Sequence, residues 1–271
     1  MQKFDFKRFQ SVLRYTLLYN KAEYISLFIK AFVILFVVYL LVGGAIFGDI
    51  ENDINISGCV GIFYALLAIM LIWTPSRILS NMHNKQTTID YLMLPASNLE
   101  KYLGRIVSTF AYMIVIIMGA IAADAGQWIV SLIRHSITQT GSVTFTCFSA
   151  IWDMLCAAFK GGKSLDIPGI LLSFILFIWW HSLYVLGGSV FRKSPWVITS
   201  LILGFVFTAF TSVIVCAAVN LIPDGYCLEF DDYASQIVST LVFLLFAGIN
   251  YYVSYRIFQR LQVITHKWTN L

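Results

Sequence analysis

A histidine lies inside an apolar run, where an ionisable side chain is costly and usually functional. The run reads Trp179-Trp-His-Ser182, with His181 near its middle. Ionisable side chains inside a membrane face the helix bundle or a cavity, so His181 is a candidate for lining a pathway. A neutral histidine bonded to a neighbouring helix would fit the same sequence. We expect Asn220 and Asn250, which also lie in apolar runs, to join helices rather than to bind ligands.

An aspartate lies towards the end of another apolar run, in Ala122-Ala-Asp-Ala-Gly126. Asp124 is the second candidate for a pathway residue, because an ionisable side chain within a span is usually functional. Alternatively, it could simply reach the lipid headgroups. Small residues surround it at Gly119, Ala123 and Gly126, and small residues favour close packing of membrane helices.

No residue cluster predicts catalysis, a metal or a cofactor. Residues 157–164 match a relaxed phosphate-loop pattern, but that site needs a strand before it and a helix after it. Here an amphipathic stretch with apolar residues from Phe148 to Phe159 precedes it, and Pro168 opens an apolar run after it. The five cysteines lack metal spacing. One disulfide among Cys147, Cys156 and Cys227 is conceivable, because we expect all three on the same side of the membrane.

The composition predicts an all-α membrane protein, because lipid must cover part of so apolar a surface. Of 271 residues, 59% are hydrophobic and 12% are charged, and the mean hydropathy is +0.80. A span needs about 20 apolar residues. The chain is expected to form a single transmembrane domain over residues 1–271. Its six expected spans are 25–47, 58–79, 103–133, 168–191, 196–221 and 236–258.

The basic residues predict the orientation, because Lys and Arg gather in cytoplasmic loops. With the N-terminus inside, all but three of the 18 basic residues lie at the cytoplasmic side; the exceptions are Arg134, Lys160 and Lys163. Both termini are therefore expected in the cytoplasm. The first apolar run is too long for a cleaved signal sequence and is expected to remain as a span.

The segment before the first span predicts a helix that lies along the membrane surface, within residues 4–22. Lys7 and Arg14 lie opposite its apolar face, which is the pattern of an interfacial helix. The residues that share the apolar face are Phe9, Val12, Leu13, Thr16 and Leu17.

The loop between the second and third spans predicts a short helix, a sharp break and a new helix. Thr87 and Asp90 suit the start of the short helix. Its apolar positions follow at i, i+3 and i+4, at Ile89, Leu92 and Met93. Pro95 ends it, because the residue before a proline is pushed out of the helical region. Ser97-Asn-Leu-Glu100 is a capping box that begins the next helix.

The order of these parts resembles the membrane subunit of an ABC-2-type transporter. In that family the loop between spans 2 and 3 forms the coupling helix that docks on the ATPase. Gln86-Thr-Thr-Ile89 and Leu92-Met-Leu-Pro-Ala-Ser97 are similar to the family's apolar stripe and its Leu-x-Pro-x-Ser break. Leu103-Gly-Arg105 is similar to its entry into the third span. The family's usual glycine is replaced by Gln86 or Thr87, and the glutamates before it are absent.

The resemblance implies a permease subunit of an exporter in a bacterial inner (plasma) membrane. Its partners would be a separate ATP-binding subunit, a second permease chain and membrane lipid, with no nucleic acid. The loop 84–97, continuing to residue 105, would carry the ATPase contact. The residues implied there are Lys85, Thr88, Ile89, Asp90, Leu92, Met93 and Pro95.

Three other classes stay open as alternatives. A channel should show polar rings along a span, and none of the six runs has a polar stripe. A scaffold that transports nothing would not need the loop after the second span. A membrane-embedded enzyme is the most distant alternative, because the chain carries no paired carboxylates within a span, no His-Glu-x-x-His and no Gly-x-Ser-x-Gly.

Overall fold

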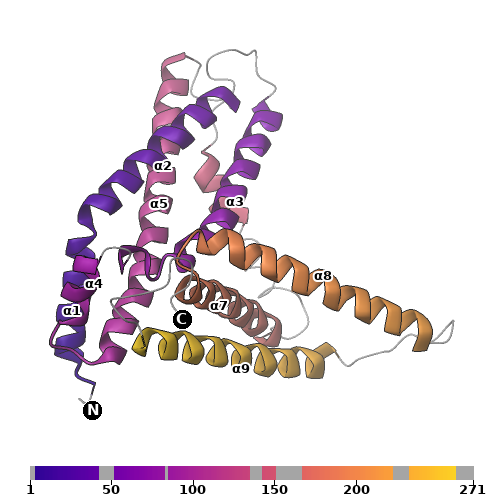
Figure 1. Ribbon diagram of the computed structural model, residues 1–271. Helices are drawn as coiled ribbons and strands as arrows, with labels where there is room; N and C mark the ends of the chain where they lie inside the picture. The colour runs from indigo at the N-terminus through magenta and orange to yellow at the C-terminus, as the bar shows by residue number, and fades with distance from the viewer. Residues whose placement is uncertain are drawn as a thin grey trace. The chain divides into compact units, whose positions relative to one another are not determined.

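A computed structural model describes residues 4–42, 52–82, 85–134, 142–150, 167–221 and 232–260. None of these residues lies in a strand, so the expectation of an all-α fold is confirmed (Figure 1). In chain order the helices are α1 Phe6–Tyr19, α2 Lys21–Val42, α3 Asn52–Ser76, the 3-10 turn η1 Ser80–Met82, α4 Lys85–Leu92, α5 Asn98–Arg134, α7 Ile167–Val190, α8 Pro195–Leu221 and α9 Asp232–Gln259. A further helical segment covers residues 143–150.

Six helices within the described residues are long and apolar enough to cross a membrane. They are α2, α3, α5, α7, α8 and α9, and each predicted span falls on one of them. The protein is therefore an integral membrane protein. The predicted second span extends three residues too far, because α3 ends at Ser76 and the Ile78 amide donates to the Pro75 carbonyl in a turn.

The chain divides into two compact units. The first comprises residues 1–74 and 99–165, with α1, α2, most of α3, α5 and the 143–150 segment. The second comprises residues 75–98 and 166–271, with α4, α7, α8 and α9. The expectation of a single transmembrane domain stays a prediction.

In the first unit, α2 and α5 approach each other closely at two glycines of α5. A Cβ placed on Gly119 of α5 would lie 2.9 Å from the Cβ of Ala31 on α2. One placed on Gly126 would lie 2.9 Å from the ring of Phe36. Ala123, on the same helix, is fully buried. The predicted role of these small residues in helix packing is thus confirmed.

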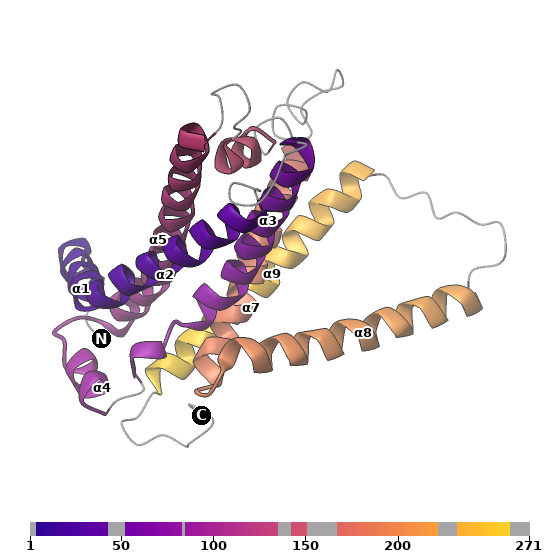
Figure 2. The ribbon, with the colours of Figure 1, turned by 90° about the horizontal axis from the view of Figure 1, so that it is seen from above.

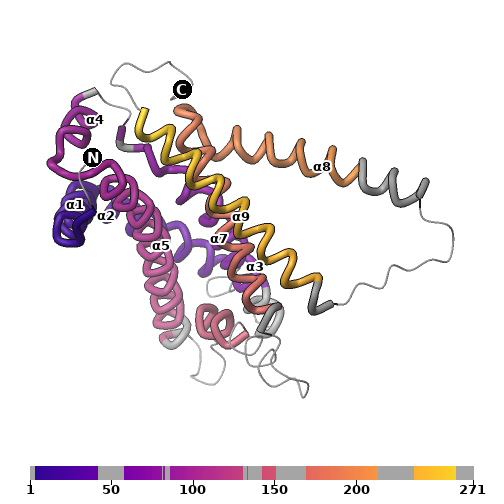
Figure 3. The backbone as a smooth tube through the Cα atoms, turned by 90° about the horizontal axis from the view of Figure 1, so that it is seen from below, coloured from indigo at the N-terminus to yellow at the C-terminus, as the bar shows by residue number. Residues whose placement is uncertain are grey.

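In the second unit, α7 packs against both α8 and α9 (Figures 2 and 3). Two polar pairs join α7 to α9. His181 Nδ1 lies 2.8 Å from the Tyr251 hydroxyl, and the Asn250 amide donates to Ser182 Oγ at 3.1 Å. The predicted helix-joining role of Asn250 is confirmed, whereas the side chain of Asn220 lies outside the described residues.

Candidate functional site

One face of the loop helix α4 is buried and contacts the turn η1. Thr88 and Tyr91 are 4% and 3% exposed. The Thr88 hydroxyl donates to the Met82 carbonyl of η1 at 3.0 Å. Thr88 therefore attaches α4 to η1, and its buried side chain is not on the surface that a partner could reach.

The opposite face of α4 is exposed and carries both apolar and polar side chains. Ile89 is 38% exposed, and Met93, one turn later, is 79% exposed. Beside them, the exposed Gln86 donates through its side-chain amide to Asp90 Oδ1 at 3.1 Å. Leu92 is half-buried. This face offers two apolar side chains next to an acid–amide pair.

The predicted break after α4 is confirmed. The Met93 amide donates to the Ile89 carbonyl at 2.9 Å and completes the last helical turn. Pro95 follows on an exposed turn, and α5 begins at Asn98, directly after the predicted cap Ser97. The side chain of Lys85, also predicted at this site, lies outside the described residues.

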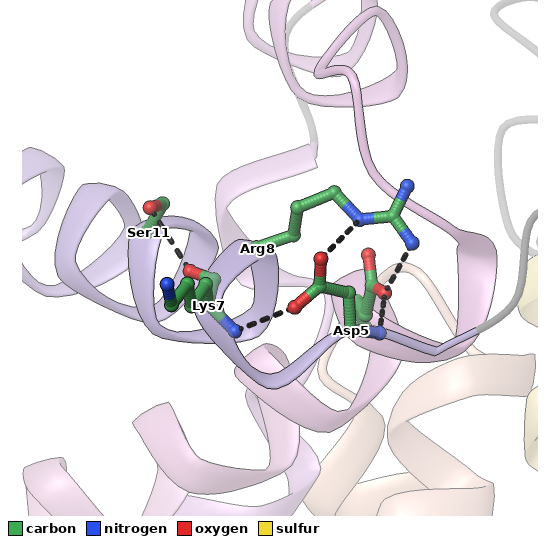
Figure 4. A network of polar contacts seen from close by, with 5 residues as sticks. Asp5, Lys7, Arg8 and Ser11 are labelled. Atoms are coloured by element: carbon green, nitrogen blue, oxygen red, sulfur yellow. Dashed lines mark hydrogen bonds and ion pairs between the residues drawn. The ribbon is translucent and has the colours of Figure 1, made fainter.

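A buried carboxylate ties the start of α5 to the start of α1. Glu100 is 0% exposed. Its Oε1 accepts from the Asp5 amide at 2.8 Å and from Arg8 Nη2 at 3.3 Å. The Asp5 carboxylate in turn accepts from the Lys7 amide at 2.9 Å and lies 3.9 Å from Arg8 Nε (Figure 4). The first turns of both helices therefore share one ionic network.

This network is the feature that sequence reasoning missed. Ser97-Asn-Leu-Glu100 predicted a role for Glu100 within its own helix, by hydrogen bonding backwards to the cap. Its contacts with Asp5 and Arg8 join positions 95 and 92 residues apart. A single sequence carries no periodic signal for such a pairing. The one available hint was a strongly polar residue at the first turn of a membrane helix.

A second polar contact lies further along α5. The Tyr112 hydroxyl donates to Glu23 Oε2 of α2 at 2.7 Å. The rings of Tyr24 and Tyr112 lie 4.7 Å apart. Lys101 and Arg105 are 4% and 5% exposed, so the first turns of α5 carry several buried charges of both signs.

Asp124 acts as a helix cap within the first unit. Its carboxylate accepts from the amides of Val143 and Thr144 at 2.9 Å and 3.1 Å. It also accepts from the hydroxyls of Ser142, at 2.6 Å, and Thr144. The carboxylate thus accepts from the first backbone amides of the 143–150 segment, which have no acceptor within their own helix, and a negative charge is stabilising there. These contacts give Asp124 a structural task, and its predicted pathway role stays a prediction.

The position of Asp124 along α5 explains why a charged residue is tolerated there. It lies 26 residues after Asn98, which is about 39 Å at 1.5 Å per residue. The hydrocarbon core is only about 30 Å thick. If α5 enters the membrane near its first turns, Asp124 comes out among the headgroups of the far leaflet, where a charge is tolerated.

The buried cysteines show no sign of ligand chemistry. Cys59 and Cys147 are free thiols. Burial, together with the nearby Asp124 carboxylate, raises the pKa of the Cys147 thiol. Cys156 and Cys227, the other members of the conceivable disulfide, lie outside the described residues, as does the phosphate-loop-like stretch 157–164. Within the described ranges, no group of three His, Cys, Asp or Glu side chains could hold a metal ion.

His181 is 6% exposed, and its side chain joins α7 to α9 through the contact with Tyr251. Its predicted pathway role stays a prediction. The sequence candidates belong to different units: His181 and α4 are in the second unit, and Asp124 is in the first. Comparison of the chain with protein-family models, curated proteins and solved structures found no match.

Proposed function

We propose that the chain is the transmembrane permease subunit of an ATP-driven ABC-type exporter. A separate ATP-binding subunit would dock on α4, and a second permease chain, identical or related, would complete the transport pathway. The membrane would be the bacterial inner membrane, with both termini in the cytoplasm, because nearly all basic residues gather on that side.

The observation that carries the proposal is the two-sided construction of α4. One face buries Thr88 and Tyr91 and is held by the Thr88 hydrogen bond to Met82, while the other presents Ile89 and Met93. A helix of eight residues is too short to be stable alone. Anchoring it to the protein while leaving apolar side chains exposed is a suitable design for docking into a groove of another protein.

Met93 is the side chain best suited to test the docking. Burying a fully exposed methionine on binding contributes about 1.5–3 kcal/mol, and Ile89, which is only 38% exposed before docking, contributes less than Met93. A charged aspartate at position 93 would lose that burial and would add the cost of desolvating a carboxylate. Leu92 is a weaker choice, because it is half-buried and Leu92→Asp would also disturb the fold.

The start of α5 would transmit a movement of α4, caused by the docked ATP-binding subunit, to the membrane-spanning helices. Only six residues separate Met93 from Glu100, and Glu100 is locked to α1. ATP-driven closure of the partner subunits would then move α5 and α1 together as rigid elements.

The test is gentle extraction of the tagged chain from its native cells, with mass spectrometry of the proteins that accompany it. We expect a soluble protein with a phosphate-loop motif in about equal amount, together with ATP hydrolysis by the complex. Met93→Asp should reduce that recovery by tenfold or more, whereas the control Met93→Leu should retain it. Recovery of the wild-type chain alone, under conditions that preserve known complexes, would instead favour a scaffold or a channel.

A further inference from the structure

The outer surface of α1 is more apolar than a simple interfacial helix requires. Val12 and Thr16 are buried, as the sequence predicts. On the exposed side, however, Tyr15, Leu18 and Tyr19 are 37%, 60% and 50% exposed. The rings of Tyr15 and Tyr19 stack with their centroids 5.8 Å apart. We name Tyr15, Leu18 and Tyr19 the aromatic edge.

A basic edge lies beside the aromatic edge. Lys7 and Arg14 are both exposed and lie two turns apart on α1. At 100° per residue, Leu18 lies between Arg14 and Tyr15 around the helix. Going around α1, the surface therefore passes from the buried face to the aromatic edge and then to the basic edge.

The basic edge carries charge that the protein does not neutralise. Lys7 and Arg14 form no ion pair among the described residues, and neither does the exposed Lys21, which begins α2. The nearby acids are occupied elsewhere. Asp5 accepts from the Lys7 amide, and Glu100 accepts from Arg8 and from the Asp5 amide.

The position of the basic edge in the chain identifies its surroundings. The membrane-spanning helix α2 begins at Lys21, two residues after α1 ends. Arg14 is thus seven residues from a span, which is at most about 10 Å along a helix. This distance is comparable with the Debye length, which is about 8 Å at physiological salt, so the charge of Arg14 is only partly screened from the headgroups. The aromatic edge would enter the outer part of the leaflet, as amphipathic aromatic side chains do.

We propose that Lys7, Arg14 and Lys21 form a binding surface for the headgroups of anionic phospholipids. The phosphate groups would lie along the basic edge, while the aromatic edge would contact the acyl chains of the same lipids. This surface is independent of the proposed transport function, because it requires only that α1 lie against the leaflet from which α2 enters the membrane.

The experiment uses the full chain reconstituted in phosphatidylcholine membranes that contain a small amount of spin-labelled lipid. Electron paramagnetic resonance measures the fraction of labelled lipid that the protein immobilises. It thereby gives the association constant of phosphatidylglycerol relative to phosphatidylcholine. We expect a several-fold preference for phosphatidylglycerol that falls as salt is raised, because salt screens exposed charges.

Variants test whether the basic residues Lys7, Arg14 and Lys21 cause the preference for phosphatidylglycerol. Lys7→Gln, Arg14→Gln and Lys21→Gln together should bring the relative association constant close to one. Each alone should lower it by about twofold or less, because three such steps make up the several-fold preference. The control replaces three exposed basic residues of the second unit, with Lys193→Gln, Arg256→Gln and Arg260→Gln, and should leave the preference in place. Equal loss in both sets, or an unchanged preference without the α1 charges, would overturn the proposal.

Discussion

Removal of Arg8 is the sharpest test of the network that joins α1 to α5. Arg8→Met keeps most of the apolar stem of the side chain and removes the guanidinium. Glu100 would then be a carboxylate at 0% exposure without the cation that lies 3.3 Å from it. The hydrogen bond from the Asp5 amide would remain. The expected result is a loss of stability in a protein that is otherwise unchanged.

The expected loss in the free energy of unfolding follows from how deeply Arg8 and Glu100 are buried. Removing one partner of a fully buried ion pair costs about 3–5 kcal/mol. The Arg8 side chain is 34% exposed, so water already weakens this pair. We therefore expect about 1–3 kcal/mol, with a shift in Tm of about 2–4 °C for each kcal/mol.

Glu100→Gln completes a double-mutant cycle with Arg8→Met. Glutamine removes the charge but keeps an oxygen that can accept from the Asp5 amide. The double variant should therefore be more stable than the sum of the two single losses predicts, by about 1 kcal/mol or more. The measurement is thermal unfolding of purified protein in a neutral detergent without lipid, followed by intrinsic fluorescence.

Lys7→Met is the matched control. Lys7 lies next to Arg8, is exposed and has no ion pair among the described residues, so its replacement should change stability by no more than about 0.5 kcal/mol. If Arg8→Met behaves like Lys7→Met, or if the losses at Arg8 and Glu100 simply add, the network does not stabilise the fold and the reasoning is wrong.

Three further predictions test other parts of the first unit. Gly119→Leu should destabilise the protein by about 1–3 kcal/mol in the same assay, because its Cβ would meet Ala31; Gly204→Leu, with open space around it, should not. A variant in which Cys147 is the only cysteine should react slowly with a maleimide at neutral pH and faster as pH rises. The reason is that burial raises the pKa of the Cys147 thiol, and the thiolate is the reactive form. Labelling at the rate seen in the unfolded chain would contradict this prediction. Asp124→Ala should increase hydrogen–deuterium exchange of the 143–150 amides, and unchanged protection would show that the cap is not needed.

The helices could be predicted because apolar length alone determines them. About 20 apolar residues in a row have few stable arrangements other than a span, since lipid offers no partner for backbone amides. The ends were harder to predict, because they depend on individual caps and turns. Apolar residues continue to Leu79, yet α3 ends at Ser76 in the turn that begins at Pro75.

The faces of the short helices were only partly predictable. In α1 the apolar face was correctly predicted, but the exposed aromatic edge was not, because a membrane protein can place apolar side chains on both sides of a surface helix. In α4 the stripe of Ile89, Leu92 and Met93 was recognised. That Thr88 would face inwards depends on the position of η1, and the sequence of α4 contains no trace of it.

The length of α5 offers a physical reason to regard it as more than an anchor. Its 37 residues extend about 55 Å, nearly twice the thickness of the hydrocarbon core, without a break. A tilt of about 20°, the average for membrane helices, shortens its height only to about 52 Å, so α5 must project from the membrane. Within the projecting parts lie two carboxylates that bind other segments: Glu100 in its first turn and, given entry near that turn, Asp124 near the far surface. A displacement of the first turn would therefore move the 143–150 segment on the other side, because a continuous helix with buried attachments at both ends transmits motion along its axis.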